Sequence, residues 1–345
     1  MFLRSCHPTA GTANPPHEFL RQNRETANRE APVTTLTAVT PQTTSAERGQ
    51  WRDRLALWLP QLILAPSLFV SFVYVFVFTG WTLYVSLSNS SLLPSYDYVG
   101  FEHYVSLWQN RRWNIAYTNL FIFSVLYVIG AMAIGLLLAI LIDQRVRGES
   151  VWRTIYLYPL AVSFVVTGTV WSWLFNPTSG IQYFVRGLGW EDFSFSWTTN
   201  RQLAIYAIVI TGIWQASGFA MALFLAGLRS VDQDLIKAAQ IDGAGTARIY
   251  RRVVIPAIGP IFVAVMVVLL QFAIKTFDLA IALTNGGPGI ATTFPAIYVY
   301  DLMFQRGQIA EGAAAAIMIL LALAAVLVPY SLWQVWRRRR ESGHV

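Results

Sequence analysis

The feature that most constrains this chain is a series of apolar stretches, each long enough to cross a lipid bilayer as a helix. A spanning helix needs roughly 20 apolar residues to cover about 30 Å of hydrocarbon. Six stretches meet this length: Leu55–Tyr84, Ile115–Ile142, Val151–Phe175, Leu203–Leu228, Pro256–Leu283 and Gly312–Trp336. The sequence therefore predicts an all-α polytopic membrane protein with six transmembrane helices.

Composition agrees with this class and divides the chain into three parts. Hydrophobic residues make up 55% of the chain and charged residues only 12%, which excludes an ordinary soluble fold. Residues 1–54 are rich in polar residues and lack hydrophobic periodicity, so we expect them to be disordered. Residues 55–336 form the predicted transmembrane domain, and residues 337–345 form a basic tail.

The placement of Lys and Arg predicts the orientation, because basic residues in short loops stay on the cytoplasmic side. One side carries fifteen: Arg48, Arg52, Arg54, Arg145, Arg147, Arg153, Arg229, Lys237, Arg248, Arg251, Arg252, Arg337, Arg338, Arg339 and Arg340. The other carries five: Arg111, Arg112, Arg186, Arg201 and Arg306. We therefore expect both termini to be cytoplasmic in an inner membrane. This topology explains the net charge of +7 without a nucleic-acid-binding surface.

The segment between the fourth and fifth spans, residues 229–260, is too long and patterned for a bare connection. Ser230 and Gln233 have the spacing of a capping box at a helix start. Gly243 is expected to end that helix, because glycine readily takes the left-handed conformation of a last turn. The sequence predicts a short cytoplasmic helix, which either transmits motion from a partner or lies on the membrane surface.

Polar side chains inside the fourth span lie near its midplane, and polar groups in lipid usually face a cavity, a neighbour or a substrate. These are Trp214, Gln215 and Ser217. An indole face beside an amide suits a sugar ring. The alternative is that Gln215 makes a hydrogen bond between helices.

A second set, in the fifth span, comprises Gln271, Lys275 and Asp278, whose spacing places them on one helix face. Lys275 lies near the outer edge of the hydrocarbon. The set either lines an outer vestibule or locks this span to a neighbour. The last span is rich in small residues, including Ala313–Ala316, which predicts close packing within the chain or against a partner.

The loop carries a pattern that resembles permease subunits of binding-protein-dependent ATP-binding-cassette importers. Those subunits have Glu-Ala-Ala, then Asp-Gly-Ala, then Leu-Pro. This chain has Lys237, Ala238 and Ala239, then Asp242, Gly243 and Ala244, and finally Ile255 and Pro256. The resemblance implies that the short helix is a coupling helix that docks on an ATPase subunit. Because Lys237 replaces the usual Glu, no acidic contact is carried over to that position.

Further segments resemble the sugar-permease branch of this family. One is Thr284–Gly289, and the segments Arg153–Pro159 and Trp214–Phe219 resemble glucose and mannose permeases. The resemblance implies a permease core at about residues 111–334 and carbohydrate import. It also implies several partners: a second permease, an ATP-binding-cassette ATPase dimer, a periplasmic solute-binding protein, the sugar and membrane lipid.

Several other functions find little support in the sequence. There is no G-x-x-x-x-G-K-S/T loop, so ATP would be bound by a partner subunit and we expect no cofactor in this chain. No nucleophile with its base or acidic cluster indicates an enzyme. The single Cys6 and the scattered histidines predict neither a disulfide nor a metal site. The remaining alternative is an ion-coupled secondary transporter using Lys275 and Asp278.

Overall fold

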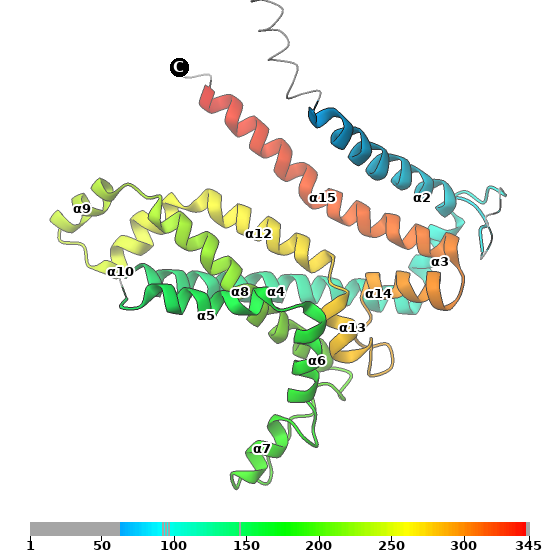
Figure 1. The fold of residues 1–345 in the computed structure, drawn as a ribbon, viewed down its shortest axis with the longest axis horizontal. Helices are drawn as coiled ribbons and strands as arrows, with labels where there is room; N and C mark the ends of the chain where they lie inside the picture. Colours follow the sequence, from blue (N-terminus) through cyan, green and yellow to red (C-terminus); the bar gives the residue numbers. More distant parts are fainter. Residues whose placement is uncertain (1–62, 92, 94, 96, 145, 343–345) are drawn as a thin grey trace, which may run out of the picture. The chain divides into compact units, whose positions relative to one another are not determined.

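The computed structural model describes residues 63–342 except 92, 94, 96 and 145 (Figure 1). The predicted disordered segment 1–54 and the first residues of the predicted first span lie outside this range. The chain divides into two units, Met1–Leu68 and Phe69–Val345, and the second unit contains the helical bundle. Apart from an isolated β-bridge between Ser88 and Tyr98, the regular structure of the described residues is helical.

The elements follow one another as helices, with three short π-helical segments labelled η. The first half of the chain contains η1 (Val73–Val77), α2 (Phe78–Ser86), α3 (Glu102–Gln109), α4 (Arg111–Asp143), α5 (Glu149–Ala161), α6 (Phe164–Leu174) and α7 (Ile181–Gly187). Then come α8 (Ala204–Arg229), α9 (Gln233–Ile241), α10 (Thr246–Ile249), η2 (Tyr250–Val254), α11 (Ile255–Ala257) and α12 (Gly259–Ile274). The chain continues with α13 (Asp278–Thr284), α14 (Pro295–Tyr300), η3 (Asp301–Gln305) and α15 (Ile309–Ser342).

The prediction of six spans agrees with the structure when each of two bent helix pairs is counted as one span. Within the described residues, the helices long and apolar enough to cross a membrane are Ile63–Ser86, Arg111–Asp143, Ala204–Arg229 and Ile309–Trp336. Two bent pairs also qualify, so the total is six when each pair counts as one span. α4 has 33 residues, which is about 50 Å at 1.5 Å per residue, so it extends well beyond the hydrocarbon.

The third predicted span, Val151–Phe175, is wrong as a single straight helix. α5 and α6 meet at an angle of 96°. Pro159 in the last turn of α5 has no N–H to donate, and Val162 is extended with φ −81° and ψ 135°. Hydropathy remains high through the bend, so a count of apolar residues does not reveal it.

The fifth predicted span, Pro256–Leu283, is interrupted twice. α11 and α12 belong to a pair that is bent by 68°. α12 ends at Ile274, and α13 begins only at Asp278. The predicted common helix face for Gln271, Lys275 and Asp278 is therefore wrong, because Lys275 lies in the connection and Asp278 starts a new helix.

The core is built around α8, which packs along α4 and also contacts α5 and α12 (Figure 1). The α4–α8 contact is close at Gly135, where a Cβ atom would lie 2.6 Å from the Cβ of Ala220. Bulky side chains then fill the contact, including the stacked rings of Phe123 and Tyr127. This packing places the C-terminal ends of α4 and α8 together at one end of the bundle.

The small residues of the last span pack within the chain in the first turns of α15. Ala314 and Ala315 are fully buried in a cluster with Leu107, Trp113 and Tyr298. A Cβ atom at Gly312 would lie 2.3 Å from a side-chain carbon of Met303. Of the two interpretations of this span, intrachain packing accounts for Ala313–Ala315.

Candidate functional site

The loop between α8 and α12 is folded, with α9 as its outermost helix. Asp232 caps α9, since its Oδ1 accepts a hydrogen bond from the N–H of Asp234 at 2.9 Å. The predicted capping box of Ser230 and Gln233 is wrong. Ser230 ends α8 instead, and its hydroxyl donates to the carbonyl of Gly227. Ser and Asp are both favoured at the start of a helix, and Ser230 and Asp232 are only two positions apart. The sequence alone therefore did not show which of the two caps α9.

The predicted helix end at Gly243 is confirmed in detail. Gly243 has φ +76°, and its N–H donates to the carbonyl of Gln240 at 3.0 Å. The N–H of Ala244 donates to the carbonyl of Ala239, also at 3.0 Å. Together these bonds form a Schellman motif, in which a left-handed residue closes the last turn and satisfies free carbonyls. The Asp242–Ala244 triplet therefore shapes the tip of the loop.

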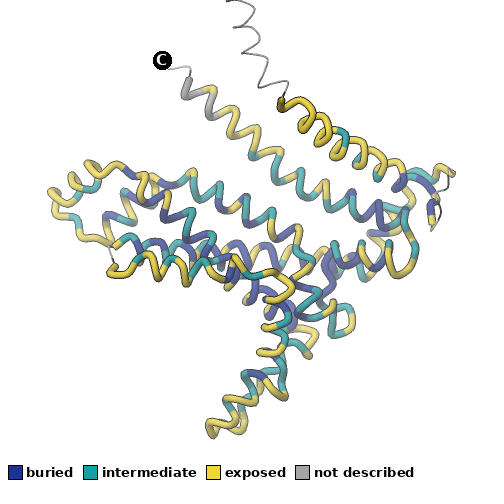
Figure 2. The backbone as a smooth tube through the Cα atoms, in the orientation of Figure 1, coloured by how far each residue is buried: buried dark blue, intermediate teal, exposed yellow. Residues whose placement is uncertain are grey.

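The residues of α9 are partly buried or exposed, and none is fully buried (Figure 2). Ile236, Ala239 and Ala244 pack against the core. The outer face is open: Leu235 is 54% exposed and Ile241 is 86% exposed. Lys237 and Ala238 are also exposed, and Lys237 pairs with Asp234 at 3.0 Å. Both aliphatic side chains are therefore available for contact with another protein.

A network of charged groups fixes the base of this loop to the ends of three long helices. Arg229 at the end of α8 contacts Glu149 at the start of α5 at 2.8 Å. Glu149 also accepts from Arg153 at 2.8 Å, and the hydroxyl of Tyr250 donates to Asp143 at the end of α4. These groups border a polar cavity of about 680 Å³ beneath α9. The network therefore joins the end of α8 to the start of α5, and it joins η2, in the returning part of the loop, to the end of α4.

The structure places Lys275 and Asp278 in the wall of a cavity of about 240 Å³. The other residues of this wall are mostly aromatic or apolar: Phe123, Tyr127, Phe164, Gly212, Phe272, Thr276, Phe277 and Leu279. Both charged side chains are exposed, and no ion pair between them is formed in the described structure. Each retains hydrogen-bonding capacity for a solute.

The remaining predicted path residues lie elsewhere. Gln271 is half-buried in α12. Trp214 is half-exposed, with its ring centroid 5.6 Å from that of Trp171, and Ser217 donates to the carbonyl of Trp214 within α8. Gln215 is only 2% exposed and donates from Nε2 to the carbonyl of Val162 at 2.9 Å. The interhelical hydrogen bond considered for Gln215 is therefore present.

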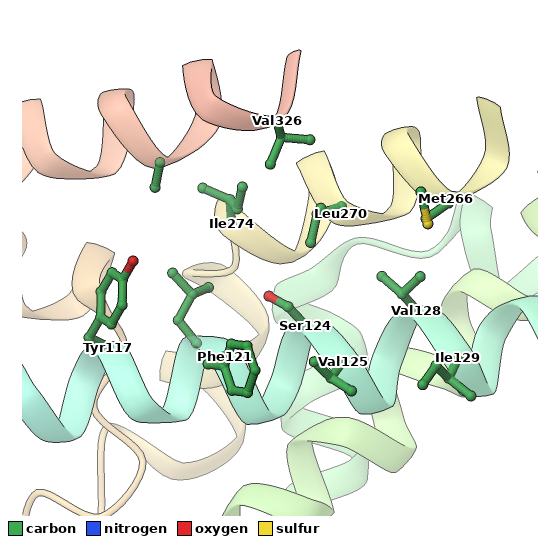
Figure 3. Close-up of a pocket in the computed structure, with 12 residues that line it drawn as sticks. Tyr117, Phe121, Ser124, Val125, Val128, Ile129, Met266, Leu270, Ile274 and Val326 are labelled. Atoms are coloured by element: carbon green, nitrogen blue, oxygen red, sulfur yellow. The ribbon is translucent and has the colours of Figure 1, made fainter. Parts of the chain in front are cut away.

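A larger cavity of about 430 Å³ lies among α4, α12 and α15 (Figure 3). Its lining is apolar except for the hydroxyls of Tyr117 and Ser124. Such a lining suits hydrocarbon and offers few partners to a polar solute. The smaller cavity with Lys275 and Asp278 is the better candidate for a solute path. Within the residues described, no group of three or more His, Cys, Asp or Glu could hold a metal ion.

Sequence reasoning missed a charged cluster at the opposite end of the bundle. Asp301 of η3 is buried and pairs with Arg112 of α4 and with Arg306, the latter at 3.0 Å. The guanidinium of Arg112 also lies over the ring of Tyr298. An aspartate in an apolar stretch was the available signal, but its partner Arg112 lies 189 positions away in the sequence.

We expect Asp301→Asn to destabilise the fold by about 2 kcal/mol, between the values for exposed and buried ion pairs. Arg112→Gln should have a larger effect than Arg306→Gln, because the Arg306 side chain is more exposed. Thermal unfolding in detergent measures all three. Equal melting temperatures for Asp301→Asn and the unsubstituted protein would show that the cluster does not stabilise this end.

Comparison with known proteins identifies the family. A family model described as "Binding-protein-dependent transport system inner membrane component" matches residues 131–342. A Pyrococcus horikoshii protein named as a probable ABC transporter permease is 39% identical over 79% of this chain and 94% of its own length. The xylose/arabinose import permease protein of Haloferax volcanii is 34% identical over 74% of this chain and 81% of its own length.

The fold agrees with a solved transporter. The crystal structure of a bacterial ABC transporter that imports the acidic polysaccharide alginate contains a chain with a TM-score of 0.72 and 21% identity. The similarity covers 84% of this chain and 98% of that one. The resemblance noted in the α9 loop is confirmed, and the secondary-transporter alternative is not supported. The chain belongs to the binding-protein-dependent transport system inner membrane components, permease subunits that work with a second permease, an ATPase and a solute-binding protein.

Proposed function

We propose that this chain forms, with the second permease, the membrane path for a carbohydrate and couples that path to the ATPase through α9. The observation that carries the proposal is the cavity in which Lys275 and Asp278 lie among aromatic rings. Aromatic faces suit the C–H faces of a sugar, and the two charged groups suit its hydroxyls. The relative from Haloferax volcanii, which is named for xylose and arabinose import, supports this class of solute.

The size and charge of the cavity favour a small neutral sugar. Its volume of about 240 Å³ lies below the roughly 300–1,000 Å³ of drug-sized ligand sites. One ammonium and one carboxylate in the wall balance each other, so the cavity has no preference for an anion. We infer that single sugar rings pass through it one at a time.

The orientation proposed for the chain places α9 and both termini on the cytoplasmic side. The end of the bundle that carries α9 also carries Arg153, Arg229, Arg251 and Arg252. Basic residues concentrate on the cytoplasmic side of membrane proteins. ATP is then hydrolysed by the partner ATPase on that side, and Lys237, Ala238, Ala239, Asp242, Gly243 and Ala244 form the contact with it.

The test is uptake into vesicles that contain the complete transporter. We expect one or more of 14C-labelled xylose, arabinose, glucose and mannose to be taken up with ATP and the cognate binding protein. Asp278→Asn should raise KM for that sugar about tenfold, because a hydrogen bond to a charged group is worth about 1.5–3 kcal/mol. Asp192→Asn, an exposed carboxylate in the loop after α7, is the matched control.

Two results would contradict the proposal separately. Uptake of an amino acid or a peptide but of none of the sugars would exclude carbohydrate as the solute. An unchanged KM for Asp278→Asn, with sugar uptake intact, would place the path outside this cavity.

A further inference from the structure

The bend between α5 and α6 is stabilised from a third helix. Val162 lies at the bend, where the backbone leaves the helical conformation, and its carbonyl accepts the hydrogen bond from Gln215 of α8. Because the acceptor is a carbonyl oxygen, the group that faces it must be the amide NH2 of Gln215. The two residues are 53 positions apart in the sequence.

A broken helix within a membrane leaves backbone groups that water cannot satisfy. Leaving a buried carbonyl unpaired costs about 1–3 kcal/mol, and the Gln215 amide supplies a partner to the carbonyl of the half-buried Val162. Gly218, three residues later on the same face of α8, permits the approach: a Cβ atom there would lie 1.9 Å from the carbonyl oxygen of Tyr156. Gln215 and Gly218 together hold α5 and its bend against α8.

The bend determines where one wall of the solute cavity lies. Phe164, two residues after Val162, is the first residue of α6 and lines the cavity. α6 also packs tightly on α13, because a Cβ atom at Gly168 would lie 2.7 Å from the Cβ of Ala282. α13 begins with Asp278, which lines the same cavity. The position of the bend is thereby linked to both sides of the cavity.

We propose that Gln215 is a positioning residue for transport: it does not touch the solute, but it sets the α5–α6 bend and so the place of Phe164 in the cavity wall. This inference rests on the proposed path through that cavity. It reassigns Gln215 from a group that binds sugar to a group that shapes the space through which sugar moves.

One detail separates this role from simple stabilisation. The Oε1 atom of Gln215 is buried without a hydrogen-bond partner. Gln215→Leu removes that unpaired oxygen while it leaves the Val162 carbonyl unpaired, and these two effects on stability have opposite signs and similar size. The variant is therefore expected to assemble with a melting temperature close to that of the unsubstituted protein, but with a loosened bend.

The first measurement is amide hydrogen exchange of the assembled transporter in lipid nanodiscs. We expect Gln215→Leu to raise the exchange rate of residues 160–167 at least tenfold and to leave α4 unchanged. Thr211→Val is the matched control, because the Thr211 hydroxyl is equally buried in α8 but bonds to the Ala207 carbonyl of its own helix. Unchanged exchange at residues 160–167 in Gln215→Leu would overturn the inference.

The second measurement is a double-mutant cycle with Phe164→Ala on KM for the transported sugar. If Gln215 acts through Phe164, the double variant should have the KM of Phe164→Ala alone, because the effects of coupled residues do not add. If the increase in KM of the double variant equalled the product of the two single increases, the positioning role would be contradicted. If the unsubstituted transporter took up no sugar, the proposed function would be contradicted. The hydrogen-exchange measurement would still decide whether Gln215 holds the α5–α6 bend.

Discussion

Gly243→Val is expected to reduce solute uptake at least tenfold while the protein still inserts and assembles in the membrane. Gly243 has φ +76°, and a β-branched residue in this left-handed region costs more than the roughly 1–2 kcal/mol of an ordinary side chain. The substitution removes the Schellman motif at the end of α9. Since no residue of α9 is fully buried, the strain is confined to the loop tip.

The measurement combines uptake with ATP hydrolysis by the reconstituted transporter. Loss of uptake with continued basal ATPase activity would show that the tip transmits conformational change to the ATPase or from it. Gly245→Ala is the matched control: Gly245 is also exposed in this loop and has φ −68°, and an added Cβ atom there would meet no neighbouring segment within 4 Å. Normal uptake by Gly243→Val would exclude the left-handed turn as part of the coupling contact.

Residues that act within their own segment were predictable from sequence. Gly243 after an amphipathic stretch predicts a helix end, since few other residues adopt the required conformation. The alanines after Gly312 predict close packing for a similarly local reason. Hydropathy is also a local average, so it predicts how many apolar segments exist and how long they are.

Helix breaks and their partners were not predictable in this way. The α5–α6 bend has a local signal in Pro159, but proline also occurs within intact membrane helices, as Pro329 does in α15. The hydrogen bond from Gln215 to Val162 joins distant segments, as does the pairing of Arg112 with Asp301. Lys275 and Asp278 were assigned to one helix face because their spacing fits a continuous helix. In the structure, however, α12 ends before Lys275, and Asp278 begins α13.

The largest effect on folding is expected from Gly218→Ala, the addition of a single methyl group. The new Cβ atom would lie 1.9 Å from the carbonyl oxygen of Tyr156 and 3.3 Å from the Cα atom of Leu157. Both obstacles are backbone atoms, which cannot rotate aside as a flexible side chain can. α5 must therefore move away from α8, and overpacking of this kind costs about 1–3 kcal/mol or more.

The displacement would also stretch the hydrogen bond that Gln215 makes to Val162, because Gln215 and Gly218 lie on the same face of α8. We expect the melting temperature of Gly218→Ala to fall and the exchange of residues 160–167 to rise together. Gly80→Ala is the matched control, since Gly80 lies inside α2 and a Cβ atom there would meet no neighbouring segment within 4 Å. If Gly218→Ala melted like Gly80→Ala, α5 and α8 would not be in the close contact on which the bend depends.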